Sequence, residues 1–208
     1  MIVYLIRHAQ SEANAKKGEH QQHVDPVSPL TDLGVQQAKE LGAFLRSDVF
    51  DKIGSFTSVY MSPALRVQQT VEAVEVYPAL SYIELMEQRP GLFEGLSLNQ
   101  IYRDYPKEGA LYAKYDNQKQ KFYAPIPGGE SQFDVYIRVQ NWVRSILLPD
   151  RQHYGHIAIF SHGVVLGCLE AILTNTDPNK MNVRGYQRNA SVRCFEQGTI
   201  KEIYNGII

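Results

Sequence analysis

The chain has 208 residues, of which 21 are Lys or Arg and 22 are Asp or Glu, so its formal net charge is −1. This balance lacks the basic surface that nucleic acids or anionic membranes attract, and we expect neither as a partner. No apolar run is long enough to span a bilayer, and the N-terminus lacks the basic segment and cleavage site of a signal peptide. The two cysteines give no disulfide framework. We therefore expect residues 1–208 to form a single cytoplasmic domain.

The first predicted strand covers residues 1–6, an uncharged run rich in aliphatic and β-branched side chains. Such a run is typical of a parallel strand that is buried on both faces. It ends at Arg7 and His8, which therefore stand where open parallel sheets bind their ligands. We expect a short helix over residues 11–17 and a polar loop over residues 19–29 to follow.

A capped helix is predicted over residues 32–46, because Thr31 is a good N-cap and the apolar positions that follow keep helical spacing. An apolar run over residues 56–60 predicts the next strand.

The helix predicted over residues 62–76 carries an arginine in its first turn. Ser62 is a good N-cap, and Pro63 suits the first helical position. Arg66 would then lie beside the positive end of the helix dipole.

The middle of the chain gives weaker signals. A short strand is predicted over residues 81–85, and it would deliver Glu87 to the edge of the sheet. Ser97 and Gln100 have the spacing of a capping box, so a helix is predicted over residues 99–105.

Residues 106–127 interrupt the pattern with a polar stretch rich in Lys and Tyr. A solvated surface is the common interpretation of this composition. The functional alternative is an excursion over the sheet, in which residues 97–130 form a lid or cap above a substrate. A long amphipathic helix is predicted over residues 131–148.

The last elements complete the predicted sheet. Residues 156–160 form an apolar run that ends two residues before His162, and a helix is predicted over residues 164–173. Two strands over residues 191–196 and 199–204 flank a Gln-Gly turn. This is a hairpin signal, so at least one edge strand should be antiparallel.

The order of elements predicts an α/β fold, a three-layer α/β/α sandwich with a mainly parallel sheet and an antiparallel edge strand. If the strands before His8 and His162 are parallel neighbours, the two histidines meet at one edge of the sheet. With Arg7 and Arg66 they would form a site for a compact dianion, because the planar fork of arginine suits phosphate oxygens.

Motifs along the chain resemble those of the histidine phosphatase superfamily, the phosphoglycerate mutase-like family. The segment from Arg7 to Ser11, with Asn14 six residues past His8, resembles the Arg-His-Gly signature of that superfamily. Further matches follow in the family's order: Leu30-Thr31-x-x-Gly34 with Gln37-Ala38, Ser62-Pro63-x-x-Arg66 with Gln69-Thr70, Glu87 with Gly91 and Glu94-Gly95, Pro127-Gly128-Gly129-Glu130-Ser131, and Ser161-His162-Gly163. One motif alone is weak, but the ordered set is specific and spans nearly the whole chain.

This resemblance implies phosphoryl transfer to a histidine and then to water. It makes His8 the nucleophile, with Arg7, Arg66 and His162 neutralising the equatorial phosphate oxygens. Glu87 would be the general acid that protonates the leaving alkoxide and later activates water. A bound phosphate would raise the pKa of this carboxyl by like charge.

Other positions near the signature are candidate substrate contacts or depart from the family pattern. Asn14 could donate to the phosphate, and Ser11 stands where threonine is frequent in the family. Arg89 lies in a Gln-Arg-Pro segment that fits neither usual subfamily pattern, and it could touch the substrate. Ala9 replaces a common glycine, and its methyl group could tighten the phosphate pocket. No metal or other cofactor is expected, since the arginines supply the positive charge.

Alternative interpretations remain for several of these residues. Taken singly, Arg7 would usually be a solvated strand end and His162 a histidine beside a helix cap. His20, His23 and Asp25 could imitate a metal site, but they lack a fourth ligand. They could instead contact distal groups of a substrate.

The leading hypothesis is a phosphomonoester hydrolase of the phosphatase branch, acting on a small phosphorylated metabolite. The alternatives are a cofactor-dependent phosphoglycerate mutase and an inactive phosphate-binding module. Mutases of the family typically carry a longer middle insertion and a C-terminal tail that shields the phosphoenzyme. Here the last predicted strand ends near Tyr204 and the sequence ends at Ile208. We therefore expect water to reach the phosphohistidine and hydrolysis to be the main reaction. The sequence does not specify the substrate or the oligomeric state.

Overall fold

The computed structural model describes residues 1–15, 26–117, 120–149, 155–180 and 187–206. Within these residues the strands form a six-stranded sheet in the order β3-β2-β4-β1-β5-β6. The strands are β1 (Ile2–Arg7), β2 (Ser58–Met61), β3 (Leu80–Ser81), β4 (His156–Ser161), β5 (Val192–Glu196) and β6 (Thr199–Tyr204).

Helices occupy most of the remaining described chain. The α-helices are α1 (Glu12–Ala15), α2 (Asp32–Phe44), α3 (Asp51–Ile53), α4 (Leu65–Val74), α5 (Leu98–Asp104), α6 (Pro106–Asn117), α7 (Gln132–Trp142) and α8 (Gly163–Leu173). Shorter π-helical or 3-10 turns lie at Leu45–Phe50, Ile83–Leu85, Gly91–Phe93, Lys121–Tyr123, Val143–Leu147 and Pro178–Lys180.

The central strands β1 and β4 are parallel neighbours. Arg7 lies opposite Ser161 in their register, so the two strands end at the same level of the sheet. β2 pairs in parallel with β4, and β3 pairs in parallel with β2. The hairpin β5–β6 forms the other edge and supplies the antiparallel pairings of β5 with β1 and β6 with β5. The predicted parallel pairing of the strands before His8 and His162 is confirmed, and so is the antiparallel edge.

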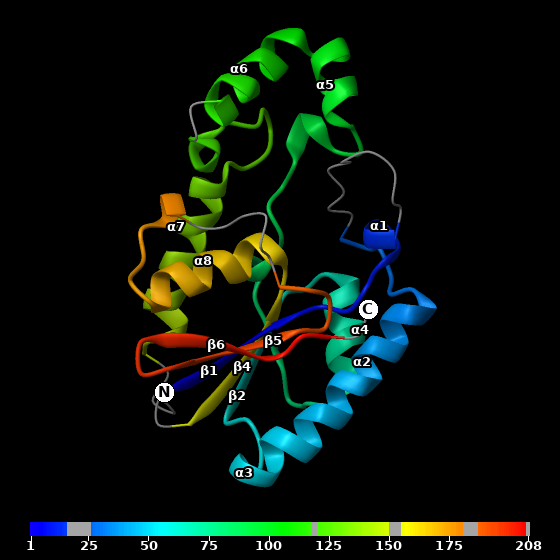
Figure 1. Cartoon of the computed structure of the whole chain (residues 1–208), viewed down its shortest axis with the longest axis vertical. Helices are drawn as coiled ribbons and strands as arrows, with labels where there is room; N and C mark the ends of the chain where they lie inside the picture. The colour runs from blue at the N-terminus through cyan, green and yellow to red at the C-terminus, as the bar shows by residue number, and fades with distance from the viewer. Residues whose placement is uncertain (16–25, 118–119, 150–154, 181–186, 207–208) are drawn as a thin grey trace.

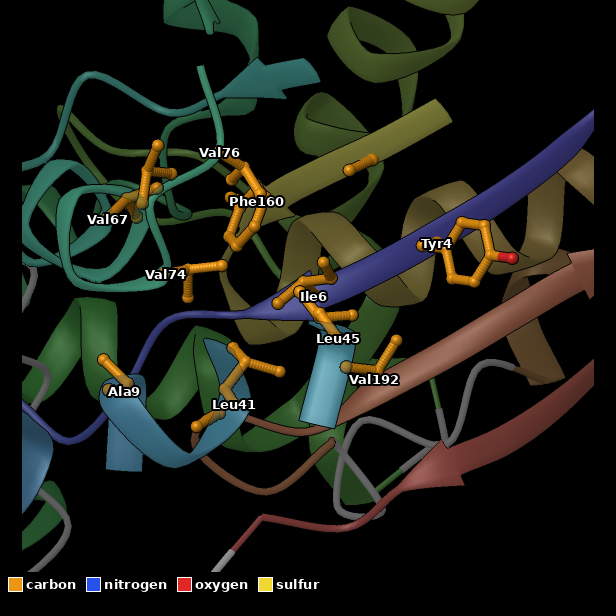
Figure 2. Packing of buried hydrophobic residues seen from close by; sticks show 14 of the residues in the cluster. Tyr4, Ile6, Ala9, Leu41, Leu45, Val67, Val74, Val76, Phe160 and Val192 are labelled. Atoms are coloured by element: carbon orange, nitrogen blue, oxygen red, sulfur yellow. The ribbon is translucent and has the colours of Figure 1, made fainter. Parts of the chain in front are cut away.

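The side chains of β1 show why helices cover both faces of the sheet. Tyr4 and Ile6 pack into one hydrophobic cluster with side chains of α2 and α4 (Figure 2). Val3 and Leu5 point to the opposite face and pack against α7 and α8. Since both faces of β1 are apolar, both must be covered, and Figure 1 shows helices on the two sides of the sheet. The three-layer α/β/α sandwich predicted from the sequence is confirmed.

Two local predictions on either side of β2 and β3 are wrong. α4 begins at Leu65 with the extended residue Ala64 as its N-cap, and Ser62 does not cap it. The predicted strand over residues 81–85 is cut short after Ser81, because the chain turns into a 3-10 turn. That turn is tied to the sheet where the hydroxyl of Ser161 donates to the carbonyl of Leu85 at 2.7 Å.

Residues 106–127, for which no helix or strand was predicted, contain the helix α6, which together with α5 stands apart from the sheet in Figure 1. These helices have a small core of their own, which consists of Phe93, Ile101, Tyr112, Ala124 and Ile126. The expectation of a solvated surface is therefore wrong for Tyr112, of which only 8% is exposed. A lid role for residues 97–130 stays a prediction.

Candidate active site

The end of the sheet brings His8 and His162 side by side. Their ring centroids are 5.1 Å apart, and the ring planes are inclined at 62°. Arg66, in the first turn of α4, connects the two rings: its Nε lies 3.3 Å from Nε2 of His8 and its Nη2 lies 3.2 Å from Nδ1 of His162. At most 3% of each of these three residues is exposed. Segments from three distant parts of the sequence thus converge on one buried cluster.

The hydrogen bonds of His8 determine its tautomer. A guanidinium can only donate, so the Nε2 that faces Arg66 must accept and carries no proton. The proton of the neutral ring is therefore on Nδ1, which donates to the carbonyl of Ala9 at 2.7 Å. A neutral imidazole can act as a nucleophile when one nitrogen is held by an acceptor and the other has a free lone pair. His8 holds the first nitrogen in this way, and Nε2 becomes the reactive atom once its hydrogen bond from Arg66 is displaced.

The same argument assigns the protons of His162. Its Nδ1 accepts from Arg66, so the proton is on Nε2, which donates to the hydroxyl oxygen of Ser62 at 2.8 Å. The hydroxyl of Ser62 in turn donates to the sulfur of Met86 at 3.3 Å. Ser62 is fully buried and orients His162, which explains why it does not cap α4. Sequence reasoning missed this role, because the Ser-Pro pair is also a good helix start.

The two histidines are neutral for an electrostatic reason. Burial lowers the pKa of His8 well below 6.5, and the charges of Arg7 and Arg66 lower it further, although the hydrogen bond to Ala9 acts the other way. Burial also lowers the pKa of His162 well below 6.5, with further contributions from His8 and both arginines. Near pH 7 the site thus combines cationic arginines with uncharged imidazoles.

Glu87 lies beside this cluster, in the segment that follows the 3-10 turn. Its Oε1 accepts from the backbone N–H of Gln88 at 2.9 Å, and its Oε2 accepts from the backbone N–H of Val164, in the first turn of α8, at 3.4 Å. Burial raises the pKa of this carboxyl, while these hydrogen bonds and the charges of Arg7 and Arg66 partly oppose the rise. From the sequence, a raised pKa of Glu87 was expected because of the charge of a bound phosphate. In the structure, burial of the carboxyl by itself raises this pKa.

A buried ion pair clamps the segment that carries Glu87. Arg138 of α7 donates to both carboxylate oxygens of Glu130, at 2.8 and 3.2 Å. It also donates to the carbonyls of Met86 at 2.7 Å, Glu87 at 3.2 Å and Glu84. Glu130 closes the arrangement by accepting from the backbone N–H of Arg89 at 3.0 Å. Sequence reasoning missed Arg138, since an arginine inside a helix is ordinarily a surface residue.

Asn14 and Ser11 form a second hydrogen-bonded group beside His8. The Oδ1 of Asn14 accepts from the backbone N–H of Ser11 at 3.3 Å and from its hydroxyl at 3.2 Å. Asn189, which sequence reasoning missed, donates to the same oxygen at 3.2 Å and to the carbonyl of His8 at 3.0 Å. The amide NH₂ of exposed Asn14 is therefore the part that could donate to a phosphate. The buried hydroxyl of Ser11 supports Asn14.

The remaining candidates are placed as follows. Arg7 is half-buried at the end of β1, and its Nη1 donates to the carbonyl of Gln187 at 2.6 Å. Arg89 is largely exposed, with its Nε 3.6 Å from Glu130. The methyl group of Ala9 packs in the hydrophobic cluster below the site (Figure 2), so the expectation that it narrows the phosphate pocket is wrong.

Gly34 has a packing role that the sequence motif did not explain. A Cβ atom at this position would lie 1.9 Å from the carbonyl oxygen of Gln10, two residues after His8. Only glycine allows α2 to approach the segment after β1 this closely.

The described parts of the chain hold no group of three or more His, Cys, Asp or Glu side chains arranged to bind a metal ion. His20, His23 and Asp25 lie outside the described residues. Cys168 and Cys194 are free thiols. Among helices in the described ranges, not one is both long and apolar enough to cross a membrane.

Comparisons with known proteins identify relatives that align with most of this chain. The 6-phosphofructo-2-kinase/fructose-2,6-bisphosphatase of Caenorhabditis elegans is 28% identical over 170 residues, which are 81% of this chain and 33% of that protein. The chain thus spans about a third of the length of that relative. The 2,3-bisphosphoglycerate-dependent phosphoglycerate mutase of Nitrobacter hamburgensis is 27% identical over 197 residues, 92% of this chain and 89% of that protein.

A solved structure and a family model extend the likeness to nearly the whole chain. The α-ribazole phosphatase from Shigella flexneri superimposes with a TM-score of 0.78 at 26% identity, over 100% of this chain and 96% of that one. The model of the histidine phosphatase superfamily (branch 1) matches residues 3–202. The chain therefore belongs to the histidine phosphatase superfamily.

Proposed function

We propose that the protein is a phosphomonoester hydrolase that works through a phosphohistidine on Nε2 of His8. The observation that carries this proposal is the tautomer of His8. Its Nδ1 proton is held by the carbonyl of Ala9, so the lone pair of Nε2 is directed into the cluster with Arg66 and His162. A histidine that only fills a core does not require a buried arginine and a second buried histidine beside it, as His8 has in Arg66 and His162.

The first step transfers the phosphoryl group to the enzyme. A phosphate dianion displaces the hydrogen bond between Arg66 and His8, and its oxygens take up the donors of Arg7, Arg66 and Asn14. Nε2 of His8 attacks phosphorus, and the bond from phosphorus to the ester oxygen breaks. Glu87, whose protonated form is favoured by the burial that raises its pKa, gives its proton to the leaving oxygen, so that a neutral alcohol departs.

The second step returns the enzyme to its starting state. The carboxylate of Glu87 takes a proton from water, and the water oxygen attacks phosphorus as the bond to Nε2 breaks. Inorganic phosphate leaves, and His8 is again neutral while Glu87 is again protonated. His162 stays neutral throughout, oriented by Ser62.

A phosphoglycerate mutase remains the second candidate, since a relative of that name aligns over 92% of this chain. In a mutase the phosphohistidine passes its phosphoryl group to a hydroxyl group of a phosphoglycerate instead of water. Both reactions use the same first step, so only the acceptor distinguishes them. The small phosphorylated substrate and the cytoplasmic location stay predictions.

The test is phosphate release from p-nitrophenyl phosphate in the presence of EDTA. We expect turnover by the wild type and none by His8→Ala, whereas the control His156→Gln, at the opposite end of β4, should keep it. A rapid acid-free quench with ³²P-labelled ester should trap a label that is stable to alkali and lost in acid, as expected of phosphohistidine. Unchanged turnover in His8→Ala would refute the mechanism. The second assay supplies 3-phosphoglycerate with a trace of 2,3-bisphosphoglycerate. If the protein isomerises 3-phosphoglycerate faster than it hydrolyses it, the mutase is favoured.

A further inference from the structure

A cavity of about 550 Å³ is lined in part by Glu87. This volume is in the range of small-molecule sites. Apolar side chains form much of its wall, namely Pro26, Ile83, Met86 and Pro90. Ile83 is 73% exposed, so its side chain is available to a ligand in this cavity.

Glu87 is shared between this cavity and the proposed phosphate site. Glu87 lines the cavity, and its Oε2 accepts from the backbone N–H of Val164, two residues after His162. A general acid must lie within hydrogen-bond reach of the oxygen that leaves. If Glu87 protonates that oxygen, the group bonded to the oxygen can extend into the cavity that Glu87 lines.

The charges around the cavity indicate what that group can be. Among the described residues, the lining holds four carboxyl groups (Glu84, Glu87, Glu94, Glu130) and two guanidinium groups (Arg89, Arg138). Arg138 directs its donors to Glu130 and to three backbone carbonyls, and the Nε of Arg89 lies 3.6 Å from Glu130. Both guanidinium groups of this described wall already face Glu130, so they are poorly placed to bind a second anionic group on the substrate.

We propose that this cavity is the leaving-group subsite, and that it takes an uncharged, largely apolar alcohol rather than one that carries a carboxylate or a second phosphate. The inference rests on the proposed function. It narrows the substrate class, because the names of the fructose-2,6-bisphosphatase and 2,3-bisphosphoglycerate-dependent relatives refer to compounds with two phosphates.

The experiment compares kcat/KM for phenyl phosphate and 4-carboxyphenyl phosphate, two esters that differ by one charge. The carboxylate makes the phenol a slightly better leaving group, so chemistry alone favours the charged ester. We expect the opposite order, with phenyl phosphate preferred by about tenfold or more. Ile83→Lys should reduce or invert that preference by adding a cation to the wall. Leu148→Lys, at a residue that is 51% exposed and outside the cavity lining, should leave the preference unchanged.

Each outcome is decisive. Equal kcat/KM for the two esters, or a preference for the charged one, overturns the apolar subsite while leaving the hydrolase intact. A preference that Ile83→Lys and Leu148→Lys affect equally shows that this cavity does not hold the leaving group. No hydrolysis of either ester by a protein with a native circular dichroism spectrum overturns the proposed function, and the subsite with it.

Discussion

Replacing Arg138 by Met removes the cation that holds the segment around Glu87. The side chain of Arg138 is 20% exposed and that of its partner Glu130 only 8%, so the pair is largely shielded from water. Removing one member of a buried pair leaves an uncompensated charge and typically costs 3–5 kcal/mol. Glu130 would keep the backbone N–H of Arg89, so we expect the lower end, about 3 kcal/mol of unfolding free energy.

The pH dependence of that loss follows from the pKa of Glu130. Burial raises the pKa of Glu130, but the hydrogen bonds and charges of Arg138 and Arg89 together lower it by more, so the net shift is downward. A lowered carboxyl pKa stabilises the folded protein above its unfolded pKa near 4.5, and this stabilisation disappears as the pH falls through the folded pKa. The difference between wild type and Arg138→Met should therefore be full at pH 7 and shrink below pH 4.5.

Urea unfolding of four proteins measures the coupling: wild type, Arg138→Met, Glu130→Gln and the double variant. We expect the double variant to lose about 1–3 kcal/mol less than the sum of the single losses. Arg144→Met, at an exposed arginine that follows the same helix, is the control and should change stability by less than about 0.5 kcal/mol. Strictly additive losses would refute the idea that Arg138 acts through Glu130.

Activity separates a positioning role from stability alone. If Arg138 positions Glu87, its loss should reduce hydrolysis of an alkyl phosphate more than that of p-nitrophenyl phosphate, because nitrophenolate leaves without help from an acid. Equal reductions for the two esters, at a temperature where the variant is fully folded, would show that Arg138 does not act on the acid.

Further expectations follow from the same site. Glu87→Gln should lower kcat for alkyl phosphates by a factor of about 10²–10⁴. Because burial raises the pKa of Glu87, this variant should also have a higher unfolding free energy than wild type at pH 8, and the difference should vanish below pH 4.5. Because the pKa values of His8 and His162 are lowered, only the unfolded chain binds their protons below pH 6.5. As the pH falls, the unfolding free energy should therefore decrease with a slope that rises to about 1.4 kcal/mol per pH unit for each histidine. Denaturation curves of the double variant His8→Gln/His162→Gln should lack that slope, and an unchanged slope would contradict the assignment. Gly34→Ala forces a methyl group against the carbonyl of Gln10 and should destabilise by about 1–3 kcal/mol, whereas an unaltered melting temperature would show that α2 can shift.

Local patterns were enough to predict most elements of this fold. The uncharged run before Arg7 required a strand covered on both faces, and the structure places Val3 and Tyr4 in clusters on opposite sides. The capping box of Ser97 and Gln100 is present as predicted. α6 was missed because, among its described positions, burial is restricted to Gly109 and Tyr112, so its hydrophobic period is weak.

The ordered motifs also identified His8, Arg66 and His162 as a group, because strand ends and a helix start bring them to one edge of a parallel sheet. The partners that orient these residues could not be predicted in the same way. Ser62 has the local character of an N-cap, but its hydroxyl is taken by His162, 100 residues away in the chain. Arg138 reaches carbonyls more than 50 residues away. Hydrophobic period and capping act within a few residues and can be read locally, whereas a buried polar group takes whichever partner the packed chain brings within 3 Å.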